Sequence, residues 1–391
     1  MPAGETRPLD TRAGSAEFEL LCLIVRPQPD LERALEVLRR GIDVEALLRI
    51  ADQHSVRPRL IRGLAALSWE GVPETCRSSL MAFRQFHLVR SLSAAQQLSR
   101  VASAFASRGV RFAAFKGATL AKLLYGDLSA REYTDIDLIV PKAQFGQAED
   151  VLASLGYRGA QGDRAFRSTF LAYLRQYAFV HPDLAVAIDL HWDFSGSHVP
   201  FPLTAAEAWN ELEDVSIGYN RVPAVSGTNL ALLLAGHGTK EAWRSLDWVC
   251  DFAMLLDRRP DLDWALIHRR AQAQSCGDSV LLACTMSQRL LGVPAPPALS
   301  RPIAERRRIR TIATALIDKL RRSERSSERA ENLTDLDLCD TRRDRLSAVL
   351  KLAFTRTVGD YEAMPLPPEL WPVYHATRPF RLAAKALAAL R

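Results

Sequence analysis

The chain has 391 residues, of which 48% are hydrophobic and 25% are charged, the proportions of an ordinary globular protein with two or three domains. This composition excludes disorder over most of the length, although we expect disorder in residues 1–16. The sequence contains no run of about 18 apolar residues, so no membrane-spanning helix is predicted. Residues 1–16 also lack the apolar stretch of a secretory signal. Since the six cysteines form no Cys-x-x-Cys pair, which is typical of a reducing compartment, we expect a cytoplasmic protein without a membrane partner.

The net charge of +6 is concentrated in one stretch. Between residues 301 and 330, ten Lys or Arg stand against four Asp or Glu. Such a stretch is suited to nucleic acid or another polyanion. Because it contains no aromatic residue that would stack on bases, we favour a solvated helix with Glu–Arg pairs, and nucleic acid is the less favoured partner.

Residues 17–100 are predicted to form a helical N-terminal region. From Leu20 onward, apolar residues recur at spacings of three and four, which is typical of a buried helix face. Three prolines divide the region into separate helices: Pro27, Pro29 and Pro58. No catalytic constellation is found in this region.

Residues 101–203 are predicted to form an α/β core in which short strands alternate with helices. The expected strands are 110–115, 134–140, 177–180 and 185–192, and the expected helices are 117–125 and 141–155. His181-Pro182-Asp183, between the last two strands, is typical of a hairpin turn. Residues 204–391 are predicted to form a helical C-terminal region, with its strongest pattern in 229–256.

Asp135 and Asp137 stand two residues apart in a segment that otherwise has the pattern of a buried strand. Because side chains alternate faces along a strand, both carboxylates project from one face while Ile136 and Leu138 pack behind them. Carboxylates that share a face repel each other unless a cation joins them, and oxygen ligands of this kind suit Mg²⁺ or Mn²⁺. An Asp-x-Asp pair alone is weak evidence, because many occur on solvated strand edges or turns.

A second acidic strand strengthens the interpretation as a metal site. Asp189, His191 and Asp193 alternate with apolar residues and therefore share a face. If this strand lies beside that of Asp135, Asp189 supplies a third carboxylate to the same ions. His191 is equally a candidate for contact with a triphosphate or proton transfer and for a hydrogen-bonded histidine on the sheet face. Asp193, beyond the expected strand end, is the weakest of the three.

Lys116, Gly117 and Thr119 stand where the first strand of the core passes into a helix. Glycine lets the backbone approach a phosphate closely, and the free N–H groups at a helix start attract its charge. Lys116 adds a positive charge at the same place, and Thr119 adds a hydroxyl. A Lys-Gly pair has little specificity by itself, so the prediction depends on its position one strand before the Asp-x-Asp pair.

A polar stripe is predicted in residues 229–256. Five residues recur there at spacings of three and four: His237, Lys240, Arg244, Asp247 and Asp251. On one continuous helix they form either a solvent face or the opposite wall of a cleft, with Lys240 and His237 near a triphosphate. An interruption of the helix at Gly236 or Gly238 would detach His237 from the others.

These motifs occur together as a set. In the core they are Lys116-Gly117, Leu120, Leu124-Tyr125, Arg131, Asp135-Ile136-Asp137-Leu138, Gly156-Tyr157 and Asp189-Leu190-His191-Trp192. Beyond the core they include His237, Lys240, Trp243, Leu246, Asp251, Asp360 and Pro365-Leu366-Pro367. As a set they resemble a poorly characterised bacterial nucleotidyltransferase family of the polymerase-beta-like superfamily, over most of the chain from about residue 17.

The resemblance implies an α+β fold, in which a small mixed-sheet nucleotidyltransferase core is flanked by N-terminal and C-terminal helical regions. It also implies transfer of a nucleoside monophosphate from an NTP to an unidentified acceptor (a small molecule, peptide, protein or RNA), with release of pyrophosphate. Asp135 and Asp137 would hold two Mg²⁺ or Mn²⁺ ions. Asp189 would bind the catalytic ion and help to deprotonate the acceptor hydroxyl.

One departure from the wider superfamily concerns the phosphate loop. The superfamily has Gly-Ser there, whereas Gly117 is followed by Ala118 in this chain. Contacts to the phosphates then fall to Lys116, Thr119 or the backbone. The donor and the direction of group transfer are therefore open.

Two alternatives follow. The first is kinase-like phosphoryl transfer to a peptide, protein or small molecule by the same metal site. The second is a non-catalytic nucleotide-binding scaffold that has kept the fold. Three intact aspartates count against the scaffold, because a protein without a bound cation has no reason to keep unpaired carboxylates together.

Overall fold

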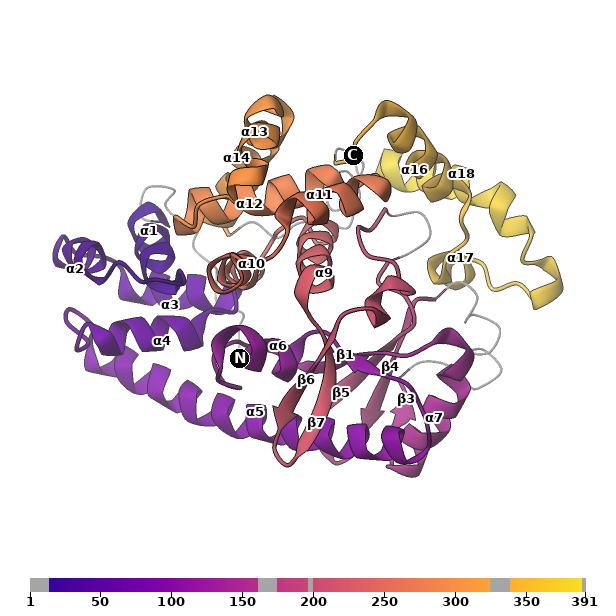
Figure 1. Ribbon diagram of the computed structural model, residues 1–391, viewed down its shortest axis with the longest axis horizontal. Helices are drawn as coiled ribbons and strands as arrows, with labels where there is room; N and C mark the ends of the chain where they lie inside the picture. Colours follow the sequence, from indigo (N-terminus) through magenta and orange to yellow (C-terminus); the bar gives the residue numbers. More distant parts are fainter. Residues whose placement is uncertain (1–13, 161–173, 196–199, 324–337, 389–391) are drawn as a thin grey trace.

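The computed structural model describes residues 14–160, 174–195, 200–323 and 338–388. Most of the segment expected to be disordered, residues 1–13, lies outside these ranges, and Gly14 already begins a helix. The described chain forms a mixed sheet that is covered by helices from both ends of the sequence (Figure 1), which confirms the predicted α+β fold class.

The N-terminal region is helical, as predicted. Its helices are α1 (Gly14–Val25), α2 (Leu31–Arg39), α3 (Val44–Gln53), α4 (Arg57–Ala66) and α5 (Glu74–Ser107). Asp30 and Asp43 cap α2 and α3, because their carboxylates accept the backbone N–H groups of Arg33 and Ala46. Helix α5 continues from this region along the sheet (Figure 1) and thereby joins the two parts.

Seven strands of the described chain form one sheet in the order β3-β4-β5-β2-β1-β7-β6. They are β1 (Ala113–Ala114), β2 (Asp135–Ile139), β3 (Arg158–Gly159), β4 (Gln176–His181), β5 (Leu184–His191), β6 (Leu212–Ile217) and β7 (Asn220–Val225). β2 pairs with β5 and β1 with β7 in parallel, whereas the other neighbours are antiparallel. β1 is much shorter than the strand expected over 110–115.

Two of these strands correct the expectation of a purely helical region after residue 203. β6 and β7 form a hairpin that extends the sheet of the core. Val215 and Ile217 in β6, like Val222 and Ala224 in β7, are buried at alternate positions, so the period of two is present. The pattern is hard to recognise because β6 is an edge strand with exposed acidic residues and β7 contains Pro223.

One face of the sheet is apolar and packs on α5 and α7 (Phe145–Ser154), which follows the short 3₁₀ helix η1 (Lys142–Gln144). Leu138 of β2 and Ile188 and Leu190 of β5 are fully buried there, in a core that includes Phe105. Because side chains alternate along a strand, the residues between them project from the opposite face. That face carries the polar residues of β2 and β5.

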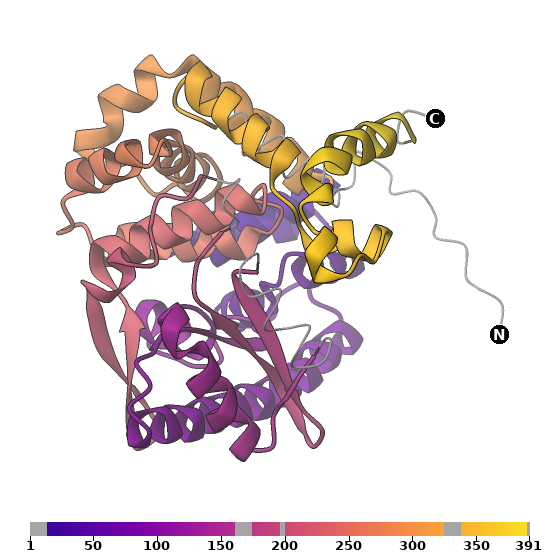
Figure 2. The same ribbon diagram turned by 90° about the vertical axis from the view of Figure 1, so that its right-hand side faces the viewer.

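The C-terminal region is otherwise helical. After η2 (Glu207–Trp209), its helices are α9 (Gly227–Lys240), α10 (Leu246–Arg258), α11 (Trp264–Ala273), α12 (Gly277–Leu291), α13 (Pro297–Glu305), α14 (Arg307–Arg321), α16 (Arg342–Phe354), α17 (Val358–Ala363) and α18 (Val373–Ala388), with η3 (Pro368–Leu370) before α18. Helices α9 to α14 share one hydrophobic core with α1 to α4. The yellow helices α16 to α18 lie on the opposite side of the molecule from α1 to α4 in Figure 1, and the yellow C-terminal part of the chain projects to the right in Figure 2.

The basic stretch forms α13 and α14 as far as residue 321, and residues 324–330 lie outside the described ranges. Helix α14 is amphipathic: Ile309, Leu316 and Leu320 are buried while most of its arginines face solvent. No helix among the described residues combines the length and apolar character needed to cross a membrane.

Candidate active site

Asp137 and Asp189 face each other on neighbouring strands. The predicted pairing of these two strands is confirmed, since β2 and β5 run parallel with Asp137 opposite Asp189. Ligand atoms of Asp137, Asp189 and His191 all lie within 4.8 Å of one another. Asp193 lies past the end of β5, where its carboxylate is 3.7 Å from Arg175. The polar face of two parallel strands therefore brings together an acidic cluster from segments 50 residues apart or more.

Asp137 is buried, and two neighbours keep it ionised. Its Oδ1 atom lies 3.0 Å from His191 Nε2 and 3.8 Å from Lys116 Nζ. Burial raises the pKa of Asp137, but Lys116 and the hydrogen bond from His191 outweigh burial and hold the pKa below its ordinary value. Burial lowers the pKa of His191. His191 is therefore neutral near pH 7 and donates its Nε2 hydrogen to the carboxylate, which fixes the orientation of Asp137.

The surroundings of Asp135 and Asp189 raise the pKa values of these carboxyl groups, in contrast to those of Asp137. Burial, followed by the charges of Asp137 and Asp189, raises the pKa of Asp135 to about 6. Burial and Asp137 also raise the pKa of Asp189, whose Oδ2 atom accepts a hydrogen bond from Gln176 Nε2 at 3.1 Å. The three carboxylates thus repel one another, and a bound cation would relieve this repulsion.

Helix α6 (Gly117–Tyr125) begins directly beside the acidic cluster. Gly117 has a φ of +56°, and a Cβ atom there would come within 3.2 Å of the Asp135 carbonyl oxygen, so the position favours glycine. Lys116 lies just before the helix and reaches Asp137. Thr119 is fully buried and its hydroxyl donates to the Lys116 carbonyl oxygen at 2.9 Å. Of the predicted phosphate ligands in this loop, the structure brings Lys116 and Gly117 to the cavity but not Thr119.

The predicted polar stripe is not on one helix. α9 ends at Lys240 and α10 begins at Leu246, separated by a turn in which Ala242 and the fully buried Trp243 have φ values of +51° and +49°. Trp243 is fully buried within this turn, and the regular spacing of polar residues does not indicate the turn. Helix α9 continues through both glycines, and its end carries the polar residues His237 and Lys240.

His237 lines the same cavity as Lys116. Its ring packs edge-on against Trp248 at a centroid distance of 5.1 Å. Burial, then the positive charges of Lys116 and Lys240, lowers the pKa of His237 well below its ordinary value, so the imidazole is neutral. Lys240 Nζ lies 3.8 Å from Glu241 Oε1. The structure therefore brings His237 to the cavity and places Lys240 at the end of the same helix.

A buried ionic cluster forms part of the cavity wall. Arg59 donates to Asp247 at 2.7 Å, to Asp251 at 3.1 Å and to the Tyr125 hydroxyl at 2.6 Å. A single nitrogen of Arg131, Nη2, lies 3.0 Å from both aspartates. Burial raises the pKa of Asp251, and both arginines and Tyr125 oppose this rise. Two cations and two anions thus compensate one another inside the protein.

The sequence alone does not single out Arg59, because no catalytic constellation is expected in the N-terminal region. Arg59 lies on the buried side of α4, in a helix whose buried residues include Leu60 and Leu64. A charged residue among the buried residues of a helix is seldom without a partner. That position is the signal which predicts an ionic contact, although it does not identify the partner.

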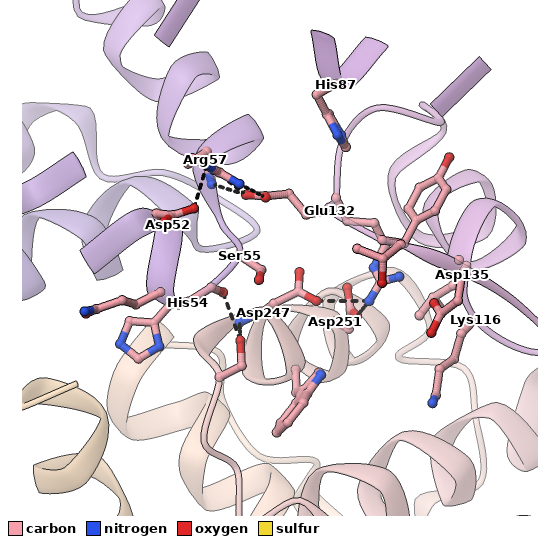
Figure 3. A pocket seen from close by; sticks show the side chains of 18 of the residues that line it. Asp52, His54, Ser55, Arg57, His87, Lys116, Glu132, Asp135, Asp247 and Asp251 are labelled. Carbon is pink, nitrogen blue, oxygen red and sulfur yellow. Dashed lines mark hydrogen bonds and ion pairs between the residues drawn. The ribbon is translucent and has the colours of Figure 1, made fainter. Parts of the chain in front are cut away.

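The cavity between these elements has a volume of about 1060 Å³. Its walls come from α3, α4, α5, α6, the segment before β2, α9 and α10. Figure 3 shows Lys116 and Asp135 at one end, Asp52 and Arg57 at the other, and the helix that carries Asp247 between them. The N-terminal helices therefore form one end of the cavity, and the sheet, with Asp135 and Asp137 of β2, forms the other.

Comparison with known proteins identifies the family of the chain. A family model described as an uncharacterised nucleotidyltransferase matches residues 40–292, more than half of the chain. The chain belongs to this family. The solution structure of the antibiotic-resistance factor ANT(2'')-Ia is similar to 58% of this chain and 94% of that chain, with 13% sequence identity and a TM-score of 0.27. No curated protein matches the chain. The family match spans every cluster described above, from α3 to α10.

The donor atoms of this nucleotidyltransferase fit a divalent cation. Asp135, Asp137 and Asp189 offer carboxylate oxygens, the ligands preferred by Mg²⁺ and Mn²⁺. Burial first, and then the charges of neighbouring carboxylates, raise the pKa values of Asp135 and Asp189, and a bound cation would oppose both effects. The hydrogen bond from His191 to Asp137 orients that carboxylate.

Proposed function

We propose that this nucleotidyltransferase moves a nucleoside monophosphate from an NTP to a hydroxyl group of an acceptor and releases pyrophosphate. The ions would be Mg²⁺ or Mn²⁺, held by Asp135, Asp137 and Asp189. The observation that carries the proposal is the pairing of Asp137 with Asp189 across two parallel strands, with Asp135 and Asp137 lining a large cavity.

The residues of the chain divide the work of the reaction. When bound, the ions would polarise the α-phosphate and the acceptor oxygen. Asp137, kept ionised by Lys116 and His191, would bind both ions. Asp189 would accept the proton of the acceptor hydroxyl at Oδ1, because Gln176 already donates to Oδ2.

The triphosphate would lie against the start of α6 and the end of α9. Gly117 lets the backbone approach the phosphates, and Lys116 and Lys240 supply positive charge from two sides. His237, neutral and inside the cavity, would donate a hydrogen bond rather than a charge. These groups replace the hydroxyl that the sequence lacks at Ala118.

The two ends of the cavity offer places for two substrates. Its volume of about 1060 Å³ is close to the upper limit of the range of about 300–1,000 Å³ for small-ligand pockets. An NTP at the end that holds Asp135 and Lys116 leaves the end near Asp52 and Arg57 for the acceptor (Figure 3).

The test is to incubate the protein with Mg²⁺ or Mn²⁺, each α-labelled NTP and a cell extract, and to measure pyrophosphate and labelled acceptor. Release of pyrophosphate together with a labelled product that Asp137→Asn does not form supports the proposal. Release of a nucleoside diphosphate indicates the kinase-like reaction instead. If the protein binds an NTP but forms no product, it is the nucleotide-binding scaffold. If it binds neither Mn²⁺ nor any NTP in calorimetry, the proposal is wrong.

A further inference from the structure

The segment between α6 and β2, residues 126–134, leads directly into Asp135 and is tied to helices from other parts of the chain. His87 Nε2 of α5 lies 3.2 Å from the Ser129 carbonyl oxygen, the acceptor of its hydrogen. The Tyr133 hydroxyl donates to the Leu128 carbonyl oxygen at 3.1 Å, within the segment itself. The segment is therefore fixed along its length before it reaches the sheet.

Two charged side chains of this segment form ion pairs with different helices. Arg131 Nη2 bridges Asp247 and Asp251 of α10, at 3.0 Å from each. Glu132 accepts hydrogen bonds at Oε1 from the Arg57 backbone N–H and Nε, both at 3.1 Å. Consecutive residues thus connect the entry to β2 with the C-terminal helical region and with the first turn of α4.

We propose that Arg131 and Glu132 are positioning residues for Asp135, so that both helical regions of the chain act on the geometry of the metal site. The proposal rests on the metal site of the proposed function. Asp135 is three residues from Glu132 and is the first residue of β2, so a shift of the segment moves its carboxylate directly. Misplacement of a reacting group by about 1 Å costs up to about 10²-fold in rate.

Both side chains also line the cavity. Glu132 is half-buried beside Arg57, at the end opposite Lys116 (Figure 3). Ion pairs that serve only stability would be equally effective anywhere in the core. The ion pairs of Arg131 and Glu132 lie instead between the proposed acceptor end of the cavity and Asp135, and they fix the position of one end relative to the other.

The experiment measures the affinity of the full-length, metal-free protein for Mn²⁺ alone by isothermal titration calorimetry, together with thermal unfolding. The first variant combines Arg131→Met with Asp247→Asn, which removes one cation and one anion and keeps the cluster neutral. We expect Mn²⁺ affinity to fall about tenfold, the lower end of the effect of losing supporting contacts around a metal site. Glu132→Gln, which weakens the tie to α4, should lower it about threefold.

Arg131→Lys is the conservative variant. Because one nitrogen of Arg131 reaches both aspartates, a lysine ammonium can replace it, and Mn²⁺ affinity should stay within about twofold of the wild type. The matched control is Asp278→Asn in α12. Asp278 is equally buried and pairs with Arg306 and Arg308, but it does not line the cavity. This variant should unfold at a lower temperature with unchanged Mn²⁺ affinity.

The outcomes separate the two proposals. Unchanged Mn²⁺ affinity in the folded double variant overturns the positioning role, and if that variant does not fold, unchanged affinity in Glu132→Gln overturns it. A loss in Asp278→Asn as large as in the double variant also overturns it, because the effect would then be general loss of stability. If the wild type does not bind Mn²⁺, or Asp137→Asn binds it equally well, the metal site is wrong and the positioning role fails with it.

Discussion

Two pairs of aspartates border the same cavity and differ in what surrounds them. Asp135 and Asp137 are two residues apart on a strand, and Asp247 and Asp251 are four residues apart on a helix. Each spacing puts both carboxylates of a pair on one side of its element. By local sequence alone the two pairs are equivalent.

Their partners make them different. The helix pair meets two arginines that come from α4 and from the segment before β2, at distances of 2.7 to 3.1 Å. The strand pair meets Lys116 at 3.8 Å and a neutral His191, and a third carboxylate, Asp189, lies opposite. The spacing of aspartates in the sequence therefore predicts where carboxylates lie close together. The number of neighbouring positive charges determines whether such a pair belongs to a structural ion cluster or to a cation site.

The largest expected effect separates the pairs by function. Asp137→Asn should abolish nucleotidyl transfer while the protein stays folded, because an amide cannot replace a carboxylate that binds both ions. The measurement is release of labelled pyrophosphate. Asp193→Asn is the matched control, since Asp193 lies past the end of β5 near Arg175, and it should retain activity. An active Asp137→Asn enzyme would contradict the assignment of the metal site.

The second prediction separates the pairs by stability. Asp247→Asn leaves Arg59 and Arg131 buried with only one aspartate, and an uncompensated buried charge costs about 3–5 kcal/mol. We expect a loss near the lower limit, because asparagine still accepts one hydrogen bond. Urea unfolding measures it, with Asp261→Asn in an exposed ion pair as the control that leaves the midpoint unchanged. An equal midpoint in both variants would show that the helix pair is not a structural cluster.

Prediction from sequence succeeded where one strand or helix contains the whole pattern. The acidic strands and the start of α6 were found because alternation and glycine are local signals. The pairing of Asp137 with Asp189 also followed, although it required the assumption that their strands are neighbours.

Prediction failed where distant segments decide the outcome. Arg59 is 188 residues from Asp247, and nothing near either residue identifies the other. The break between α9 and α10 coincides with the burial of Trp243, which only the assembled core provides. The β6–β7 hairpin was missed because Pro223 and exposed acidic residues weaken its alternation.

The third prediction tests the cation that distinguishes the strand pair. Lys116→Met should raise the KM for NTP by one to two orders of magnitude, about 1.4–2.8 kcal/mol, because Lys116 lies at the helix start where the phosphates would bind. Lys142→Met, which removes an exposed lysine of η1, is the control and should leave the KM unchanged. If Lys240→Met raises the KM and Lys116→Met does not, the phosphates are bound by α9 instead.

The fourth prediction concerns the smallest effect, a change in the free energy of unfolding whose sign is opposite to that expected for Asp247→Asn. It therefore tests the difference between the strand pair and the helix pair most directly. In metal-free protein at pH 7, Asp135→Asn should raise the free energy of unfolding by about 1 kcal/mol, since it removes one of three carboxylates that repel one another. This free energy is smaller than the one that corresponds to the full pKa shift, because Asp135 is partly exposed to water.

The pH dependence of this gain follows from the direction of the shift. The pKa of Asp135 is about 6 in the folded protein and 3.8 in the absence of the shift, so the folded state binds the proton more tightly. The stability contributed by this proton is complete below about pH 4 and is lost as the pH rises through 6. The gain from Asp135→Asn should therefore be present at pH 7 and absent near pH 4.

Added Mn²⁺ should stabilise the wild type more than the variant, because only the wild type keeps all three carboxylates. A variant that is less stable than the wild type at pH 7 without metal would mean that the strand pair is as well compensated as the helix pair, and the distinction between the two would fail.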